Sequence, residues 1–163
     1  MKSYLRNSAR IDHIAIAVRD LDEALFLYQE ILGFELVARR EVKGAFSGMI
    51  SAELKAGGFS IVLVQGTDPQ SQVSRYIAEF GPGVQHVAIE VEDVASVEMT
   101  LRKSGLKFAT EVIRGSNLVQ IFTRRDSNCG MMFEFIQRVE AEDGFETVNI
   151  QKLFEQLEES NAC

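Results

Sequence analysis

The sequence predicts an α+β domain in which two paired βαβββ modules form a curled, cup-like mixed sheet, followed by one C-terminal helix. Three observations predict this fold class. The segment Ile11–Leu21 returns as Val84–Val94, and each copy is an apolar run of β type with a histidine in third place. Each copy also contains an aspartate that can cap a helix. After each copy comes a helical pattern and then three further β-type runs.

The first module is expected over residues of about 11–65. Its opening strand leads into a helix that Asp20 caps and Gly33 ends, because glycine readily adopts the left-handed conformation that follows a helix. Three apolar strands follow, with turns at Lys43-Gly44 and Gly57-Gly58. The predicted strands of this module are 11–18, 34–42, 45–54 and 59–64, and the predicted helix is 20–32.

The second module, at about 84–138, repeats this plan after a linker helix at 71–80 that Ser71 caps. An acidic connector at 140–143 precedes an amphipathic helix at about 148–159, which we expect to act as a lid. The chain 1–163 is interpreted as a single domain with a loose leader at 1–10. The predicted strands of the second module are 84–91, 106–111, 118–123 and 131–138, and its predicted helix is 93–104.

Length and charge exclude several classes of protein. The chain has 163 residues, of which 46% are hydrophobic, so it is long enough for one well-buried core. Its net charge of -7 has no compensating basic block, and a nucleic-acid backbone would be repelled. No apolar run approaches the roughly 20 residues of a membrane span, and the first ten residues are polar. We therefore expect a cytoplasmic protein that binds neither nucleic acid nor membranes.

The two histidines of the chain, His13 and His86, both stand at the repeated position. A strand histidine alone is ordinarily a core or surface residue, but the repeat predicts two ligands that converge on a pseudo-twofold axis. Aligning the last strands of the modules places Glu134 where the first module has Val62. Glu134 taken alone also fits an outward position of an alternating strand, whereas a buried Glu134 would require a partner such as a metal ion.

Two histidines and one carboxylate suit non-haem Fe(II), and the fold is therefore expected to curl around a metal site. The apolar Val62 would leave room for a bidentate substrate and oxygen. Three aspartates in or beside the repeated segments are interpreted as edge or helix-cap residues: Asp12, Asp20 and Asp93.

These segments resemble the vicinal oxygen chelate superfamily, and the second half is similar to the C-terminal catalytic domain of the 4-hydroxyphenylpyruvate dioxygenase family. The motifs that carry the resemblance are Ile11-Asp12-His13, Gly81-Pro82-Gly83-Val84-Gln85-His86, Gln120-Ile121-Phe122-Thr123 and Phe133–Arg138. The resemblance implies that Fe(II) is held by His13, His86 and Glu134. It also implies a substrate cavity lined by Ser51, Gln72, Gln85, Gln120, Phe122 and Phe154, with Asn149 on the closing helix.

Two residues depart from the pattern of this family. Ile150 stands where the family has a phenylalanine that stacks on the substrate ring, and Val64 replaces an asparagine of the polar end of the cavity. Both departures favour a substrate side chain that is less polar than hydroxyphenyl. The non-catalytic N-terminal domain of the family has no counterpart here, so we expect a stand-alone unit.

We therefore expect an Fe(II)-dependent dioxygenase that takes an α-keto acid and O2 and performs oxidative decarboxylation and hydroxylation, with homodimer formation open to it. One alternative is a metal-dependent epimerase or glyoxalase-type lyase, like methylmalonyl-CoA epimerase, that uses Zn, Co, Ni or Mn. The apolar Val62 argues against this alternative, because those enzymes use further carboxylate or amide groups as ligands or bases. Another alternative is a non-catalytic ligand-binding resistance protein, which has no need of an intact metal triad.

Overall fold

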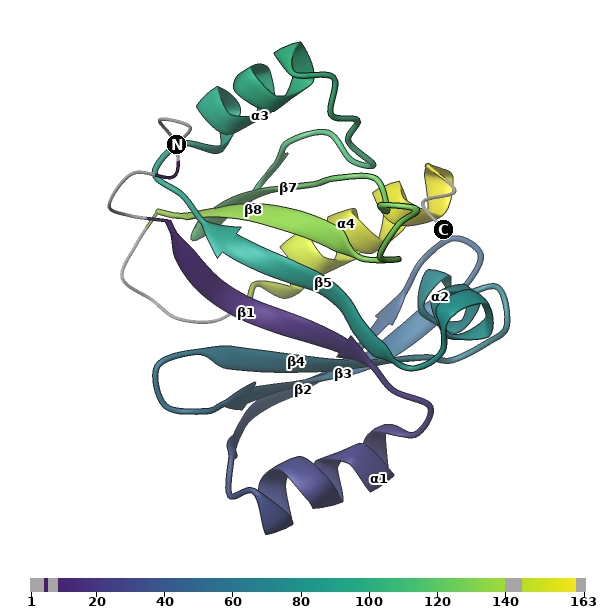
Figure 1. The fold of residues 1–163 in the computed structure, drawn as a ribbon. Coiled ribbons are helices and arrows are strands. Elements are labelled where there is room, and N and C mark those ends of the chain that lie inside the picture. Colours follow the sequence, from purple (N-terminus) through teal and green to yellow (C-terminus); the bar gives the residue numbers. More distant parts are fainter. Residues whose placement is uncertain (1–4, 6–8, 140–144, 161–163) are drawn as a thin grey trace.

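One continuous mixed sheet of eight strands forms the framework of the molecule, in the order β2-β3-β4-β1-β5-β8-β7-β6 (Figure 1). The structure is a computed structural model that describes residues 5, 9–139 and 145–160. The strands are β1 (Arg10–Ala17), β2 (Glu35–Lys43), β3 (Gly48–Lys55), β4 (Ser60–Gly66), β5 (Gly83–Glu90), β6 (Ile113–Arg114), β7 (Leu118–Phe122) and β8 (Met132–Arg138). The helices are α1 (Leu21–Leu25), which continues into η2 (Phe26–Ile31), α2 (Gln72–Phe80), α3 (Val94–Lys103) and α4 (Thr147–Glu159).

The two halves of the sheet repeat one pairing pattern. In the first half β1 pairs with β4 in parallel, and in the second half β5 pairs with β8 in parallel. The registers are equivalent, because His13 lies opposite Ser60 just as His86 lies opposite Met132. The halves meet where β1 pairs with β5 in antiparallel fashion. The predicted fold class, two paired βαβββ modules in a curled mixed sheet with a C-terminal helix, is confirmed.

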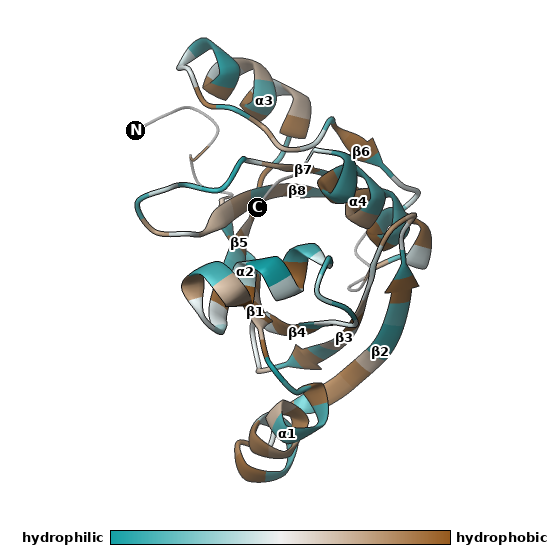
Figure 2. Ribbon diagram, turned by 90° about the vertical axis from the view of Figure 1, so that its right-hand side faces the viewer, coloured by the Kyte–Doolittle hydropathy of each residue, from teal (hydrophilic) through white to brown (hydrophobic). Residues whose placement is uncertain are grey.

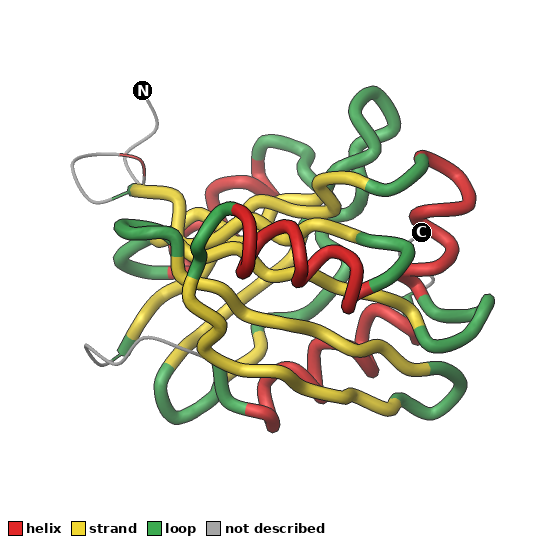
Figure 3. The backbone as a smooth tube through the Cα atoms, turned by 90° about the horizontal axis from the view of Figure 1, so that it is seen from below, coloured by secondary structure: helices red, strands yellow, loops and turns green. Residues whose placement is uncertain are grey.

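Alternation along the strands sends every second side chain to the outer face of the curled sheet. On the first half the outward side chains pack against Leu21 and Leu25 of α1, and Figure 3 shows this helix lying over the strands. On the second half they pack against Val94, Val97 and Leu101 of α3. Each half therefore has its own outer hydrophobic core. Figures 1 and 2 show the two helices that cover these cores, α1 and α3, at opposite ends of the molecule.

Helix α4 lies at the opening of the cup, between the edge strands β2 and β6 (Figure 2). It buries Phe154 against residues of the first half and Leu157 against Phe122 and Met132 of the second half. Carboxylates near its two ends attach it to both halves, since Glu146 accepts a hydrogen bond from the Ser116 hydroxyl and Glu158 accepts one from the Ser47 hydroxyl. The closing helix thus bridges the two halves.

The strand predicted at 106–111 is wrong. Phe108 forms a single bridge with Thr123, and the strand next to β7 is instead the short β6. Phe108, Ala109 and Thr110 are all buried, so the segment lacks the alternation of a strand. The Thr110 hydroxyl accepts the hydrogen bond of the Phe122 N–H at 3.0 Å, in place of a strand carbonyl.

Two other predicted boundaries also differ from the structure. The helix predicted at 20–32 is α-helical only to Leu25 and continues as a π-helix, in which the Leu32 N–H donates to the carbonyl of Leu27. The wider turn rotates Ile31 and Leu32 toward solvent. The strand predicted from Ala45 begins at Gly48, because the N–H of Ala45 and the hydroxyl of Ser47 both bond to Glu158 of α4.

No helix among the described residues is long and apolar enough to cross a membrane. The predicted acidic connector at 140–143 and most of the predicted leader at 1–10 lie outside the described residues.

Replacing Phe154 by alanine should lower the free energy of unfolding by about 3–5 kcal/mol, because the ring is fully buried beneath α4 and its loss leaves a cavity. Urea denaturation of both proteins measures the difference. Phe46→Ala is the matched control, since that ring is 74% exposed and its loss should cost within about 0.5 kcal/mol. Equal losses in the two variants would contradict the bridging role of α4.

Candidate metal centre

Three ligand-type side chains converge on the inner face of the cup, where β1, β5 and β8 lie side by side. The Nε2 atom of His13 lies 3.3 Å from Nε2 of His86 and 3.2 Å from Oε2 of Glu134. The remaining separation, between Nε2 of His86 and Oε2 of Glu134, is 3.6 Å. His13, His86 and Glu134 are exposed by only 2%, 9% and 1% of their surfaces. The structure thus brings together the three residues that the repeat singled out.

A β-bulge precedes each histidine. The register of β1 against β5 shifts between Ile11 and His13, which leaves Asp12 as the extra residue of β1. Strict alternation would send Asp12 to the opposite face from His13, but here its carboxylate lies 2.8 Å from Nδ1 of the His13 ring. Arg138 holds the carboxylate from the other side, with Nε and Nη2 donating at 3.0 and 2.9 Å. Asp12 therefore orients the His13 ring with Nε2 toward the site.

The second histidine has a related support built from amides. The register shifts again between Ala15 and Ile16, and the extra residue of β5 is Gln85. Its side-chain carbonyl lies 3.2 Å from Nδ1 of His86, and its amide donates to the carbonyl oxygen of Gln72 at 2.9 Å. Both histidines are thus positioned by the side chain of the preceding residue, which is a carboxylate in one half and an amide in the other.

Burial disfavours the charged forms of both imidazoles, but their surroundings move the two pKa values in opposite directions. Burial lowers the pKa of His13, yet the facing Glu134 carboxylate and the hydrogen bond to Asp12 outweigh it and raise this pKa to about 9. Burial, together with the positive charges of His13 and Arg125, holds the pKa of His86 well below its usual 6.5. Without a metal ion, His13 is therefore protonated at neutral pH and His86 is neutral.

The three side chains fit a divalent metal ion. Ligands that lie about 2.0–2.3 Å from one ion lie roughly 2.8–3.7 Å from one another, and all three measured separations fall in this range. Among the described residues, Oε1 of Glu134 is buried without a hydrogen-bond partner, which is costly for a carboxylate unless an ion compensates it. The donor set of two imidazole nitrogens and one carboxylate suits first-row metals, including Fe(II) and Zn.

A cavity of about 60 Å³ adjoins the triad. Val62 lines it, and its place in the register is equivalent to that of Glu134, because Ala15 lies opposite Val62 as Ala88 lies opposite Glu134. The first half therefore contributes no fourth ligand from this strand position. The triad and Val62 aside, the cavity is lined by Arg40, Met49, Ser51, Val64, Gln120, Phe122, Phe145, Ile150 and Leu153.

The residues predicted to line a substrate cavity occupy two kinds of position. Four of them line the cavity beside the triad: Ser51, Gln120, Phe122 and Ile150. The other four are buried but do not line this cavity: Gln72, Gln85, Asn149 and Phe154. Gln72 and Gln85 support His86, whereas Asn149 donates to the carbonyl of Leu118 at 3.4 Å and fixes α4 to β7. The roles of all eight toward a substrate stay predictions.

Sequence reasoning missed four residues of the site. The prediction for Asp12 is an edge or helix-cap residue, although its place before a repeated histidine matches that of Gln85. Arg40 reaches the cavity wall and donates to the buried Glu53 at 3.0 Å and to the carbonyl of Phe145 at 3.3 Å. The ring of Phe145 meets the His13 ring edge-on at 4.9 Å. Alternation along the two strands could have found this pair, because Arg40 lies two residues from Val42 and Glu53 two residues from Ser51.

Comparison with known proteins agrees with this geometry. Residues 10–135 match the model of the Glyoxalase/Bleomycin resistance protein/Dioxygenase superfamily. The chain belongs to this superfamily. The matched region runs from the start of β1 into β8 and contains all three candidate ligands.

The similar proteins within the superfamily are named for different activities. The chain is 28% identical to 4-hydroxyphenylpyruvate dioxygenase of Pseudomonas aeruginosa over 91% of its own length and 52% of that protein. A triple mutant of 4-hydroxymandelate synthase from Streptomyces coelicolor superimposes with a TM-score of 0.85 at 22% identity, covering 94% of this chain and 55% of that chain. Methylmalonyl-CoA epimerase from Mycobacterium tuberculosis superimposes with a TM-score of 0.70 at 27% identity, covering 86% and 93%. The chain thus spans about half the length of the dioxygenase it matches.

The affinity of the site for a divalent metal should rise about tenfold per pH unit from pH 7 to about 9, because binding must displace the proton held by His13. Above the pKa of His13 the metal affinity should no longer rise with pH. His86 is already neutral in this range, so no proton has to leave it when the metal binds. Titration calorimetry with Co²⁺ at several pH values measures the slope. An affinity that does not change between pH 7 and 9 would contradict it.

Asp12→Asn provides the matched variant for this experiment. Loss of the carboxylate should weaken Co²⁺ binding at pH 9 by about 10–100-fold, as for other groups that hold a metal-binding histidine. The deficit should shrink toward pH 6.5, because the same change also lowers the pKa of His13. Asp20→Asn, at the exposed N-cap of α1, is the control and should leave Co²⁺ binding unchanged.

Proposed function

We propose that the chain is an Fe(II)-dependent dioxygenase that acts on an α-keto acid. The observation that carries the proposal is the triad of His13, His86 and Glu134 beside a cavity in which Val62 occupies the position equivalent to Glu134. An apolar side chain there leaves the metal with three protein ligands. Such a set provides the open positions that a chelating keto acid and oxygen require. The similarity to 4-hydroxyphenylpyruvate dioxygenase supports the same assignment.

Bound Fe(II) would supply the redox chemistry that couples O2 to the loss of CO2 from the keto acid and to hydroxylation of its side chain. One oxygen atom enters the new carboxylate and the other enters the new hydroxyl group, so both atoms of O2 are used. The protein residues orient and enclose the substrate. Gln120 offers an uncharged amide next to the triad, while Phe122 and Ile150 form apolar walls.

We infer that α4 and Phe145 exclude water from the cavity beside the triad. A cavity of about 60 Å³ is small compared with ordinary ligand pockets of roughly 300–1,000 Å³, so we expect these side chains to move when an α-keto acid enters. Ile150 and Leu153 of α4 line the cavity, and Arg40 ties the carbonyl of Phe145 to the buried Glu53. We infer that this part of the structure opens for the substrate and then closes over it.

The alternative is a metal-dependent epimerase, which the similarity to methylmalonyl-CoA epimerase favours. An epimerase moves a proton off carbon and returns it, and this requires an acid–base group beside the substrate. Among the described residues that line the cavity, the triad supplies the only carboxylate and the only imidazoles, and the one other charged group is Arg40. The cavity therefore supports the dioxygenase better. The homodimer and the cytoplasmic location stay predictions.

Val62→Glu should separate the two functions. A carboxylate at this position would supply a fourth protein ligand, so the variant should keep or tighten its metal binding but lose keto-acid-dependent oxygen uptake by roughly a hundredfold or more. An oxygen electrode with Fe(II) and a panel of α-keto acids gives the readout. Val62→Leu is the control and should keep oxygen uptake. Deuterium exchange into methylmalonyl-CoA without any oxygen uptake by the unaltered protein would instead favour the epimerase.

Substrate preference should favour an unsubstituted phenyl or a branched-alkyl side chain over hydroxyphenyl. Val64 lines the cavity and is buried, so a ring hydroxyl beside it would lose about 1–3 kcal/mol for want of a hydrogen-bond partner. Ile150 in place of a ring removes a stacking face worth about 0.5–1.5 kcal/mol, or about tenfold in affinity. The measurement is kcat/KM for 4-hydroxyphenylpyruvate, phenylpyruvate and 4-methyl-2-oxopentanoate.

Ile150→Phe should raise kcat/KM for phenylpyruvate relative to the alkyl acid by up to about tenfold. Val148→Phe, on the same helix but 61% exposed, is the control and should leave the ratio unchanged. A hundredfold preference of the unaltered protein for the hydroxyphenyl acid would show that Val64 and Ile150 do not set the preference.

A further inference from the structure

A buried ion pair forms part of the wall beside the candidate metal centre. Arg40 of β2 donates through Nη1 to Oε2 of Glu53 on β3 at 3.0 Å, and Glu53 is only 2% exposed. Arg40 lines the cavity beside the triad, and its side chain is 17% exposed. Most of the other residues that line this cavity outside the triad are apolar. A fixed positive charge therefore lies in the wall of a largely apolar cavity.

The strand register places both members of the pair on the inner face of the cup. Glu53 lies opposite Val62 on β4, and Val62 lines the cavity. Arg40 lies opposite Ser51 on β3, which in turn lies opposite Val64 on β4. Directly paired residues of antiparallel strands project from the same face. Arg40 thus belongs to the same inner wall as Ser51 and Val64.

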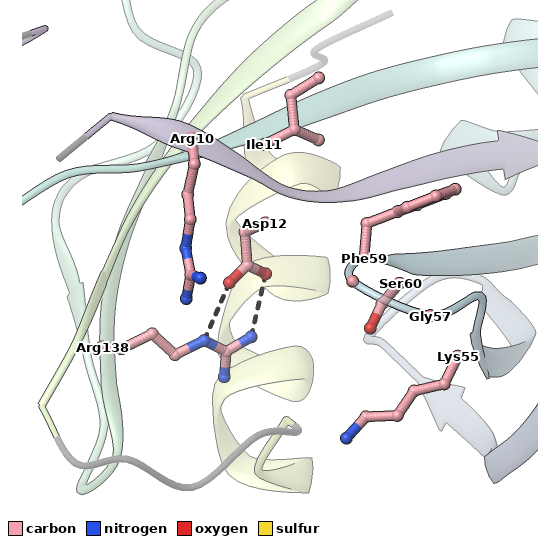
Figure 4. A pocket seen from close by; sticks show the side chains of 9 residues that line it. Arg10, Ile11, Asp12, Lys55, Gly57, Phe59, Ser60 and Arg138 are labelled. Atoms are coloured by element: carbon pink, nitrogen blue, oxygen red, sulfur yellow. Dashed lines mark hydrogen bonds and ion pairs between the residues drawn. The ribbon is translucent and has the colours of Figure 1, made fainter. Parts of the chain in front are cut away.

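A buried ion pair needs a reason, because burying two charges takes them out of water, and apolar residues of similar volume are often at least as stabilising. Figure 4 shows another such pair, in which Arg138 donates to both oxygens of Asp12. That pair has a use, since Asp12 also orients the His13 ring. Among the described residues, neither Arg40 nor Glu53 has a hydrogen bond to a candidate ligand. A role toward the molecule that enters the cavity would account for this pair.

The second contact of Arg40 is one that a substrate can replace. Its Nη2 donates to the carbonyl oxygen of Phe145 at 3.3 Å, longer than the usual distance of about 2.9–3.0 Å. Phe145 also lines the cavity, so a molecule that enters it displaces this residue or packs against it. An oxygen atom of that molecule would take over the Nη2 donor, while Glu53 keeps the guanidinium in place.

The charges around the cavity favour a neutral oxygen atom. Glu53 neutralises Arg40, and a divalent ion would be neutralised by Glu134 together with the carboxylate of the keto acid. A second carboxylate on the substrate would then be buried without a compensating charge, which is costly. A hydroxyl or carbonyl oxygen avoids this cost and still accepts the charge-assisted hydrogen bond that Arg40 offers.

We propose that Arg40 determines specificity by donating a hydrogen bond to a neutral hydroxyl or carbonyl oxygen on the side chain of the keto acid. The inference rests on the proposed function, because it requires the keto acid to chelate an ion at the triad. Val64 lies on β4 and Arg40 on β2, with β3 between them. The substrate side chain is therefore apolar where it passes β4 and carries its oxygen beside β2.

Three keto acids that differ only at the terminal carbon test the inference: 2-oxohexanoate, 6-hydroxy-2-oxohexanoate and 2-oxoadipate. Calorimetric titration of the Co²⁺-loaded protein in the absence of O2 measures the affinity for each acid without turnover. We expect the hydroxy acid to bind about tenfold to a hundredfold more tightly than 2-oxohexanoate, because it gains a hydrogen bond to a charged donor. 2-Oxoadipate should bind more weakly than the hydroxy acid, since its second carboxylate has no compensating charge.

Removal of the whole pair is the variant of choice. Arg40→Met alone would leave the Glu53 carboxylate buried without a partner, which strongly destabilises a fold. The double variant Arg40→Met, Glu53→Leu removes both charges, and it should bind 2-oxohexanoate as before but lose the preference for the hydroxy acid. Arg39→Met is the matched control, because the neighbouring Arg39 pairs with Asp22 on the surface. This control should keep the preference.

Equal affinity of the unaltered protein for 2-oxohexanoate and the hydroxy acid would overturn the inference, and so would a preference that survives in the double variant. Tightest binding of 2-oxoadipate would overturn the assignment to a neutral oxygen. Oxygen uptake by the Fe(II)-loaded protein with the same acids tests the proposed function separately. If the double variant loses the preference but no acid supports oxygen uptake, the proposed dioxygenase is wrong and the recognition by Arg40 stands.

Discussion

The antiparallel pairing of β1 with β5 is the contact on which the candidate metal centre depends. It places His13 opposite Ala88 and His86 opposite Ala15, so each imidazole has a methyl group as its neighbour across the pair. Both alanines are fully buried, and their small size leaves the space in which the two rings meet. A larger residue at either position would fill that space. The bulges in the same pair then turn Asp12 and Gln85 toward the rings.

Much of this fold could be predicted from the sequence, because the two halves repeat both their apolar patterns and their caps. Asp93 and Ser71 begin α3 and α2 as their side-chain chemistry predicts. The predictions failed where contacts distant in sequence decide local structure. Hydrogen bonds from Ala45 and Ser47 to Glu158 make β3 begin later than predicted. The Thr110 hydroxyl accepts the hydrogen bond of the Phe122 N–H that a strand carbonyl would otherwise accept. The local sequence pattern does not show which distant residues will form these hydrogen bonds.

The candidate ligands could be predicted for the same reason. Both histidines of the chain occupy the equivalent position of the two repeats, which indicates that they share one site. The residues around them were harder to assign. A bulge cannot be read from alternation, so the contact of Asp12 with His13 and that of Gln85 with His86 could not be predicted from the strand pattern. Arg40 and Glu53 form an ion pair across the neighbouring strands β2 and β3, and the sequence of one strand alone does not show which residue of the other strand it pairs with.

The ligands are divided between the two halves, with His13 on β1 and with His86 and Glu134 on β5 and β8. An ion held by all three would cross-link two contiguous lengths of chain, each of which already has its own outer core. Any opening that separates the halves would have to release that ion. Without the ion the two halves could unfold locally at different free energies, whereas with the ion bound they would unfold together. A bound metal ion would therefore link the two halves of the curled sheet mechanically.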